Sequence, residues 1–205
     1  MSGQSKGILV HFIGYPISVL GPGTRVGIWL QGCTIRCKNC LAPESWDFDP
    51  KKFINFNDIK EKLYHYSKYS PDGITISGGE PFDQPEALLT LLKIVNELRY
   101  PSIMVYSGYS FEFLLKIYSD HLHFIDILVT EPFDFTQTDK KIWRGSDNQK
   151  IHLISDRAND LFNEIELNQI EYQDERDLQI FTVSNSIFIA GIPKRSDIYD
   201  YKDIL

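Results

Sequence analysis

The chain has 205 residues, of which 42% are hydrophobic and 13% aromatic, so it has enough apolar material for a folded core and is not wholly disordered. Its 28 acidic and 21 basic residues give a formal net charge of −7, which provides no basic excess for binding nucleic acid. No apolar run approaches the length of a membrane span, and His11 interrupts the N-terminal apolar stretch too early for a signal peptide. We therefore expect a cytoplasmic protein that binds neither nucleic acid nor a membrane.

Short runs rich in β-branched and aromatic residues, bounded by Gly, Pro, Ser or Asp, predict strands. In chain order these runs are residues 7–13, 25–31, 73–77, 102–106, 125–130 and 150–154. Helical patterns lie between several of them, at residues 57–69, 84–99, 110–118 and 157–162, with predicted N-caps at Asn57 or its neighbour and at Ser110. Two further strands, 178–183 and 186–190, predict a closing hairpin.

Strands that alternate with helices predict an α/β fold with a parallel sheet and right-handed crossovers. About six such units are too few for a closed eight-fold barrel, so we expect a partial (β/α)6-type open barrel of mostly parallel strands. No repeat or linker divides the chain, which predicts a single domain over residues 1–205, with 165–205 a less regular C-terminal extension. The acidic, Tyr-containing segment 197–203 is either a docking tail or, more simply, a solvated terminus.

All three cysteines, Cys33, Cys37 and Cys40, lie in one short loop after the predicted strand 25–31. An odd number of clustered thiols argues against disulfide bonds and for a metal site. The C-x3-C-x2-C spacing lets three thiolates converge on one iron–sulfur cluster, and the lack of a fourth cysteine leaves one iron open for a substrate or cofactor. The alternative is zinc held by the cysteines and one distant histidine, although no histidine has a familiar zinc-finger spacing: His11, His65, His121, His123 and His152.

A second motif, Gly78-Gly79-Glu80-Pro81, joins the predicted strand 73–77 to the helix 84–99. Its glycines allow the backbone to approach a ligand closely, and Glu80 and free backbone carbonyls can accept hydrogen bonds from an ammonium group. Taken alone, the motif fits an ordinary strand-to-helix turn equally well. In folds of this class, however, loops at the C-terminal ends of the strands build the active site, and both motifs fall on such loops.

The two motifs together resemble the radical S-adenosylmethionine (SAM) superfamily. The resemblance implies that Cys33, Cys37 and Cys40 bind a [4Fe–4S] cluster whose open iron is chelated by the amino and carboxylate groups of SAM. It also implies that Gly78, Gly79, Glu80 and Pro81 contact the SAM amino group. The expected reaction is reductive cleavage of SAM to methionine and a 5′-deoxyadenosyl radical, with the protein supplying position and exclusion of water. Arg36 and Lys38 either assist reduction of the cluster or are solvated loop charges.

The resemblance extends to the small activating enzymes of glycyl-radical proteins, and is closest to the activators of anaerobic ribonucleotide reductase. It rests on Gly21-Pro22-Gly23-Thr24-Arg25, Ser45-Trp46, Ser107-Gly108-Tyr109 and the segment Arg-Gly-Ser-Asp-Asn-Gln-Lys at 144–150. It implies a radical SAM oxidoreductase that installs a glycyl radical on a large partner enzyme, such as anaerobic ribonucleotide reductase. Flavodoxin or ferredoxin is the electron donor that the resemblance implies.

The chain departs from the family pattern at two places. Asn39 stands where the family often has an aromatic residue before the third cysteine, so the adenine contacts would rest on the backbone and on Leu41. Thr130-Glu131 stands where the activators tend to carry Asp-Gly. The remaining SAM contacts are predicted at Ser107 and Thr130.

Three alternative functions stay open on the sequence alone. The first is a small-molecule radical SAM enzyme resembling 7-carboxy-7-deazaguanine synthase, and the second is a radical SAM enzyme that modifies another peptide or protein. The third is an iron–sulfur electron carrier or a SAM-binding module without activity. The small size of the chain favours a macromolecular target, because small-molecule enzymes usually need extra segments to bury their substrate.

Overall fold

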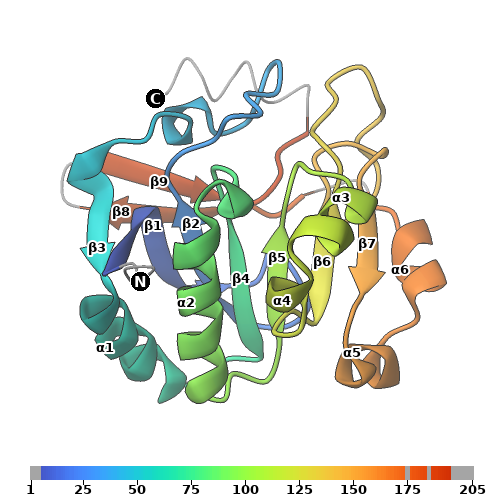
Figure 1. Cartoon of the computed structure of the whole chain (residues 1–205). Helices are drawn as coiled ribbons and strands as arrows, with labels where there is room; N and C mark the ends of the chain where they lie inside the picture. The colour runs from blue at the N-terminus through green and yellow to red at the C-terminus, as the bar shows by residue number, and fades with distance from the viewer. Residues whose placement is uncertain (1–5, 174–175, 184–185, 195–205) are drawn as a thin grey trace.

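A seven-stranded sheet forms the centre of the molecule in the computed structural model, which describes residues 6–173, 176–183 and 186–194 (Figure 1). The strand order is β3-β1-β2-β4-β5-β6-β7, so β3 and β7 form the two edges and the sheet is open. The strands are β1 (Gly7–Ile17), β2 (Arg25–Leu30), β3 (Phe53–Asn55), β4 (Gly73–Gly78), β5 (Ile103–Tyr106), β6 (Ile127–Thr130) and β7 (Lys150–Leu153).

The middle of the sheet is parallel and its outer parts are antiparallel. Strands β2, β4, β5 and β6 pair in parallel, whereas β1 runs antiparallel to both β2 and β3, and β7 runs antiparallel to β6. The predicted α/β class with an open, mostly parallel sheet is confirmed. The antiparallel outer strands are the part of the topology that the alternation of strands and helices did not predict.

One face of the sheet is covered by the helices α1 (Phe56–Ser67), α2 (Pro85–Glu97), α3 (Phe111–Ile117) and α4 (Ser119–Leu122). Side chains alternate between the two faces of a strand, so Val26, Ile28 and Leu30 of β2 all point to this layer and are fully buried. Every residue of β2 is buried, as expected for a strand that has cover on both faces.

The other face is covered by the later part of the chain, which contains α5 (Asp156–Leu161), α6 (Glu164–Gln169), β8 (Gln179–Val183) and β9 (Ser186–Ala190). Strands β8 and β9 form an antiparallel hairpin, as predicted. Trp29 of β2 points to this side and packs in a cluster with Ala190 and Ile192, while Leu167 of α6 packs near β5, β6 and β7. The C-terminal segment therefore builds the second layer of the fold.

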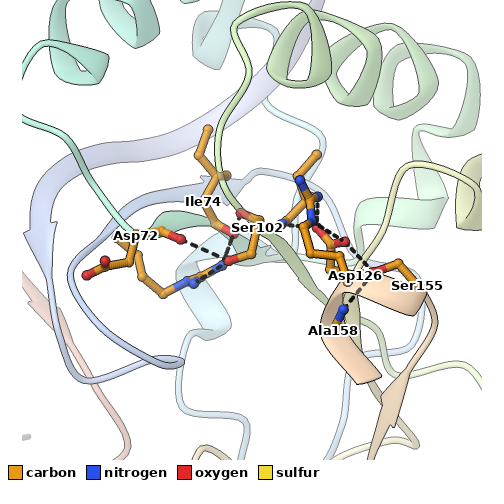
Figure 2. A network of polar contacts seen from close by, with 9 residues as sticks. Asp72, Ile74, Ser102, Asp126, Ser155 and Ala158 are labelled. Atoms are coloured by element: carbon orange, nitrogen blue, oxygen red, sulfur yellow. Dashed lines mark hydrogen bonds and ion pairs between the residues drawn. The ribbon is translucent and has the colours of Figure 1, made fainter. Parts of the chain in front are cut away.

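A network of polar side chains, which includes the buried Arg25 and Asp126, joins the N-terminal ends of β2, β5 and β6 (Figure 2). The fully buried Arg25 donates a hydrogen bond to Ser102 Oγ over 2.9 Å, and burial lowers the pKa of its guanidinium to about 10. Asp126 accepts a hydrogen bond from the Ile103 amide over 2.7 Å and pairs with Arg157 at 2.6 Å. The cysteine loop and the Gly-Gly-Glu turn leave the opposite ends of the strands, so this network is structural.

Two helix starts test the predicted caps. Ser110 caps α3 by accepting a hydrogen bond from the Phe113 amide over 3.3 Å, as predicted. The prediction of a cap at Asn57 or its neighbour is wrong, because α1 begins at Phe56 and Asn55 accepts from the Asp58 amide over 3.0 Å. A three-residue strand, β3, ends at that same Asn55, and so short a strand leaves no hydrophobic period to recognise.

Within the described ranges, no helix is both long enough and apolar enough to cross a bilayer. The first five residues and the acidic segment 197–203 lie outside the described residues.

Candidate functional site

The cysteine loop leaves the C-terminal end of β2 and is held there by its own returning segment. The Gly32 amide donates to Ser45 O over 2.7 Å, and the Cys33 amide donates to Trp46 O over 2.8 Å. Gly32 has a φ of +106°, which residues with a side chain rarely adopt. The chain thus turns sharply out of the strand directly before the first cysteine.

The Gly-Gly-Glu turn at the end of β4 packs directly on the start of the cysteine loop. The Gly79 amide donates to Leu30 O over 2.8 Å, and the Glu80 amide donates to Gly32 O over 2.9 Å. A Cβ atom on Gly79 would lie 2.1 Å from Gly32 O, and one on Gly78 would lie 2.4 Å from Leu30 N. The two glycines are therefore required by the close approach of the two loops, and this contact holds the two sequence motifs together.

The three cysteines line one cavity of about 220 Å³, together with Gly78 and Gly79. All three are free thiols of intermediate burial. Burial is the main cause that raises the pKa of Cys33 and of Cys37. Deprotonated sulfurs at these positions need a nearby positive charge, which a metal group bound in the cavity would supply.

The side chains around the cavity include three thiols and one histidine, His11, which bear on whether the cavity suits a cluster or a single metal ion. Among the residues that the structure describes, no three His, Cys, Asp or Glu side chains come together as a site for one ion. His11 lines the cavity, but its Nδ1 lies 2.8 Å from Gln31 Oε1. The other histidines considered for zinc do not line the cavity: His65, His121, His123 and His152. Three thiols spaced around a shared cavity fit an iron–sulfur cluster, whose ligands bind different irons.

Glu80 is buried, with 2% of its surface exposed, and connects the end of β4 to the end of β5. Its carboxylate accepts hydrogen bonds from Ser107 Oγ over 2.9 Å, from the Gly108 amide over 2.7 Å and from the Phe82 amide over 3.0 Å. Burial outweighs these donors and raises the pKa of Glu80 to about 7. A carboxylate offers about four acceptor sites, so the three protein donors leave capacity for one more donor from the cavity.

Asp83 joins three segments of the site and was not predicted from the sequence. Its Oδ2 accepts from the Thr34 amide over 2.6 Å, and its Oδ1 accepts from the Tyr109 hydroxyl over 2.6 Å. The cysteine loop, the turn after β4 and the Ser-Gly-Tyr segment after β5 are thereby connected through one carboxylate. Only its position three residues after Glu80 in a turn could have pointed to it.

Gln31 is a second site residue that the sequence did not reveal, and it is 2% exposed. Its amide nitrogen donates to Asp47 O over 2.7 Å and to Glu44 O over 3.0 Å. These contacts hold the segment that returns from the cysteine loop against the end of β2. A polar residue at the end of an apolar strand, directly before Gly32, was the available signal.

Comparison with known proteins places this site in a family. Residues 19–152 match the family described as a 4Fe-4S single cluster domain. The anaerobic ribonucleoside-triphosphate reductase-activating protein of Enterobacteria phage T4 is 32% identical over 142 residues, which cover 67% of this chain and 89% of that protein. The protein of the same name from Haemophilus influenzae is 34% identical over 148 residues, which cover 67% of this chain and 94% of that protein. This chain belongs to the radical SAM, 4Fe-4S single-cluster family.

Two further likenesses are more partial. The pyruvate formate-lyase-activating enzyme of Clostridium pasteurianum is 33% identical over 105 residues, covering 50% of this chain and 44% of that enzyme. The solved structure of QueE from Escherichia coli matches 50% of this chain and 52% of its own with a TM-score of 0.37 and 20% identity, too low a score to support an argument. The predicted radical SAM resemblance is confirmed, and membership of the family brings a [4Fe–4S] cluster and SAM as cofactors.

Within the radical SAM site, most of the predicted SAM contacts reach the cavity and three do not. The residues that line it are Leu41, Gly78, Gly79, Glu80 and Ser107. Asn39 is exposed in the cysteine loop with a φ of 58°, and Pro81 is buried in the turn that follows Glu80. Thr130 is fully buried with its Oγ1 3.0 Å from His152 Nε2. The assignments of all eight residues to SAM stay predictions.

The charges inside the cysteine loop face solvent. Arg36 pairs with Asp47 at 2.8 Å, with side-chain exposures of 55% and 85%, and its guanidinium lies 5.9 Å from the centre of the Trp46 ring. Exposed ion pairs of this kind contribute little to stability. This geometry favours solvated loop charges over a direct effect of Arg36 on a cluster.

The rest of the cavity is built by later segments of the radical SAM chain. Gly145 and Gln149 from the 144–150 motif line it, and the Gly145 amide donates to Gln149 Oε1 over 2.8 Å. The end of β9 and the residues after it also line it, although they lie beyond the family match: Phe188, Ile189, Gly191 and Ile192. The cavity therefore has a wall that the shared region does not supply.

Proposed function

We propose that this radical SAM protein is an activating enzyme that generates a glycyl radical on an anaerobic ribonucleoside-triphosphate reductase. One observation carries the proposal: three free cysteines and the Gly-Gly-Glu turn meet in one cavity, in a chain matching 89% and 94% of two relatives named for that activation. The reacting glycine lies in a large protein, which suits a compact enzyme whose cavity is built at the open ends of the strands.

In this proposal, Cys33, Cys37 and Cys40 hold the [4Fe–4S] cluster, and the turn at Gly79 and Glu80 receives the amino group of SAM. The bound cofactors supply one-electron cleavage of SAM to a 5′-deoxyadenosyl radical. The chain supplies position: Gly79 holds the two loops in contact, and Glu80 fixes the end of β4 against the end of β5. Contacts with SAM are proposed also for Leu41, Ser107, Asn39, Pro81 and Thr130.

The remaining parts of the proposal concern the setting of the reaction. We infer a flavodoxin or ferredoxin as electron donor and the cytoplasm as the compartment, because clustered free thiols require a reducing environment. We also infer that the chain works as a single domain. The support is that the C-terminal hairpin shares a hydrophobic cluster with Ile17, Leu20 and Trp29 of the first part of the chain.

The test is anaerobic reconstitution with iron and sulfide, followed by incubation with SAM, a reductant and the reductase of the same organism. We expect methionine and 5′-deoxyadenosine to form, and a glycyl-radical doublet to appear on the reductase in electron paramagnetic resonance. Cys33→Ala, Cys37→Ala and Cys40→Ala should each abolish both signals, because each removes one iron ligand. Lys38→Ala is the control, since Lys38 is exposed in the same loop.

Two results would contradict the proposal at different levels. An iron-free, zinc-loaded protein with full activity would refute the cluster assignment itself. Cleavage of SAM without any radical on the reductase would refute only the activating function and would leave a small-molecule or other protein substrate as the explanation.

A further inference from the structure

The β8–β9 hairpin lies outside the region that the family shares, yet it contributes to the cavity that holds the cysteines. The family match ends at residue 152, and the two activating proteins described above each align with 67% of this chain. Phe188 and Ile189 of β9 line the cavity, as do Gly191 and Ile192 directly after it. A segment outside the family match thus borders the cavity that holds the cysteines.

The hairpin is attached firmly enough to shape that cavity. Phe188 stacks on Phe12 of β1 with ring centres 4.0 Å apart, and meets Trp29 of β2 edge-on at 4.8 Å. Gln179 accepts a hydrogen bond from the Ser18 amide over 2.7 Å and donates one to Pro16 O over 3.0 Å. Aromatic pairs at these separations contribute stability beyond the area that they bury.

The opposite face of the hairpin is apolar and open to solvent. Ile180 pairs with Ile189 across the two strands, and Ile187 lies two residues before Ile189, so the three side chains share one face. Ile180 is 69% exposed and Ile187 is 54% exposed, whereas Ile189 also lines the cavity. Exposed apolar side chains that continue from a reaction cavity are typical of a surface that contacts a partner.

We propose that the β8–β9 hairpin is the substrate-recognition element of this chain, and that Phe188 contacts the glycine-bearing segment of the reductase inside the cavity. This inference rests on the proposed function. A protein segment that reaches the cavity meets Phe188 and Ile189 there, and Ile180 and Ile187, which share the exposed face of Ile189, receive the flanking surface of the same reductase. Phe188 is thus a specificity-determining residue, distinct from the groups that hold the cofactors.

The chain offers a matched control for this proposal. Phe181 is the cross-strand neighbour of Phe188, points to the same face of the hairpin and contacts Phe12 with ring centres 5.3 Å apart. Phe181 does not line the cavity. A role in packing alone predicts that both alanine variants lower the melting temperature, Phe188→Ala more because Phe188 also contacts Trp29, and that neither changes the KM for the reductase. A role in recognition predicts that Phe188→Ala alone raises that KM.

The experiment measures glycyl-radical formation on the reductase at varied reductase and SAM concentrations, with iron content and melting temperature recorded for each variant. We expect Phe188→Ala to raise the KM for the reductase about tenfold, the loss that follows truncation of one aromatic anchor. Phe181→Ala should leave that KM unchanged. If either alanine variant fails to fold, Phe188→Leu and Phe181→Leu give the same comparison.

The outcomes are separable. Equal KM values for the reductase in the two variants, or an increase confined to the KM for SAM in Phe188→Ala, would overturn the recognition role while leaving the activating function intact. A wild-type chain that cleaves SAM but places no radical on the reductase would refute the proposed function, and the assignment of the hairpin to that partner with it.

Discussion

Glu80 shows how one buried side chain couples the geometry of the site to pH. Burial raises its pKa from 4.5 to about 7 in the folded chain. The native state therefore binds more protons than the unfolded state between these pH values, and the free energy of unfolding falls as pH rises through that range. For the iron-free chain, we expect the free energy of unfolding to be lower at pH 7.5 than at pH 4.5 by up to about 3 kcal/mol. This decrease should be absent in Glu80→Gln, and urea unfolding at the two pH values measures it.

The comparison between wild type and Glu80→Gln isolates this carboxylate, since other titrating groups contribute equally to both proteins. Ser107→Ala is a second control that removes only one of the three donors to Glu80 and keeps its charge. A wild-type stability that does not fall relative to Glu80→Gln over this pH range would show that the three hydrogen bonds outweigh burial.

Substitution of Gly79 and of Gly108 by alanine compares a clash of the new Cβ atom with the backbone and a clash with a flexible side chain. A Cβ on Gly79 would lie 2.1 Å from a backbone oxygen, that of Gly32, whereas one on Gly108 would lie 2.7 Å from the flexible end of Ile35. We expect Gly79→Ala to lower the free energy of unfolding by about 3 kcal/mol and to reduce iron uptake, because the two loops must separate. Gly108→Ala should cost less than about 1 kcal/mol and keep normal iron content.

Urea unfolding and iron analysis after reconstitution measure both effects. Full iron uptake by Gly79→Ala would mean that the cysteines form their site without the contact between the loops.

The site residues that could be predicted from the sequence are those whose types and short spacing form a recognisable motif. Cys33, Cys37 and Cys40 occur within eight positions, and Gly79 and Glu80 are adjacent, so their types and spacing alone indicate a function. Asp83, Gln31 and Phe188 act by joining segments distant in the sequence, namely the loops after β2, β4 and β5 and the C-terminal hairpin. Their residue types and positions give only a weak local signal, because the fold creates their partners.

At the scale of elements, the parallel strands were predictable because β2, β4, β5 and β6 are buried on both faces and therefore read as continuous apolar runs. The longer helices were predictable from their hydrophobic periodicity. The direction of β1 was not predictable in this way, since an apolar run looks the same in both directions. The short β3 and the six-residue α6 offer too little length for a period to be recognised. The closing hairpin was predicted because two strand-like apolar runs follow each other closely in the sequence.

The polar network at the N-terminal ends of β2, β5 and β6, shown in Figure 2, lies away from the cysteine cavity, so a substitution in it can change stability without changing the site. Asp126 is 3% exposed and accepts from the Ile103 amide, from Ser155 Oγ and from Arg157, so it joins the starts of β5 and β6 to α5. We expect Asp126→Asn to lower the free energy of unfolding by about 2 kcal/mol, since an amide cannot accept all of these bonds. Iron content after reconstitution should equal that of wild type.

Glu97→Gln provides the comparison for Asp126→Asn. The pair of Lys60 and Glu97 at 2.8 Å is an ion pair with side-chain exposures of 48% and 59%, and its loss should change stability by less than about 0.5 kcal/mol. Equal losses in the two variants, measured by urea unfolding, would show that the buried network contributes no more than a surface pair.

At the scale of the whole molecule, the sheet lies between two layers that come from different parts of the chain. The helices α1 to α4 cover one face and lie within the family match, whereas α5, α6 and the β8–β9 hairpin follow residue 152 and cover the other face. The parallel strands are buried on both faces, so the second layer is needed for the sheet as well as for the cavity. Fold and recognition thus depend on the same C-terminal segment.

Truncation after Gln173 tests whether this second layer is part of the domain. It removes the hairpin and uncovers the cluster of Ile17, Leu20 and Trp29 on the sheet. An apolar surface of this kind favours association, so we expect increased binding of a hydrophobic dye, a lower melting temperature and oligomers in size-exclusion chromatography. Truncation after Lys194 keeps the hairpin and is the control. A monomeric, dye-free protein after the longer truncation would show that the hairpin is an appendage and that the domain ends before it.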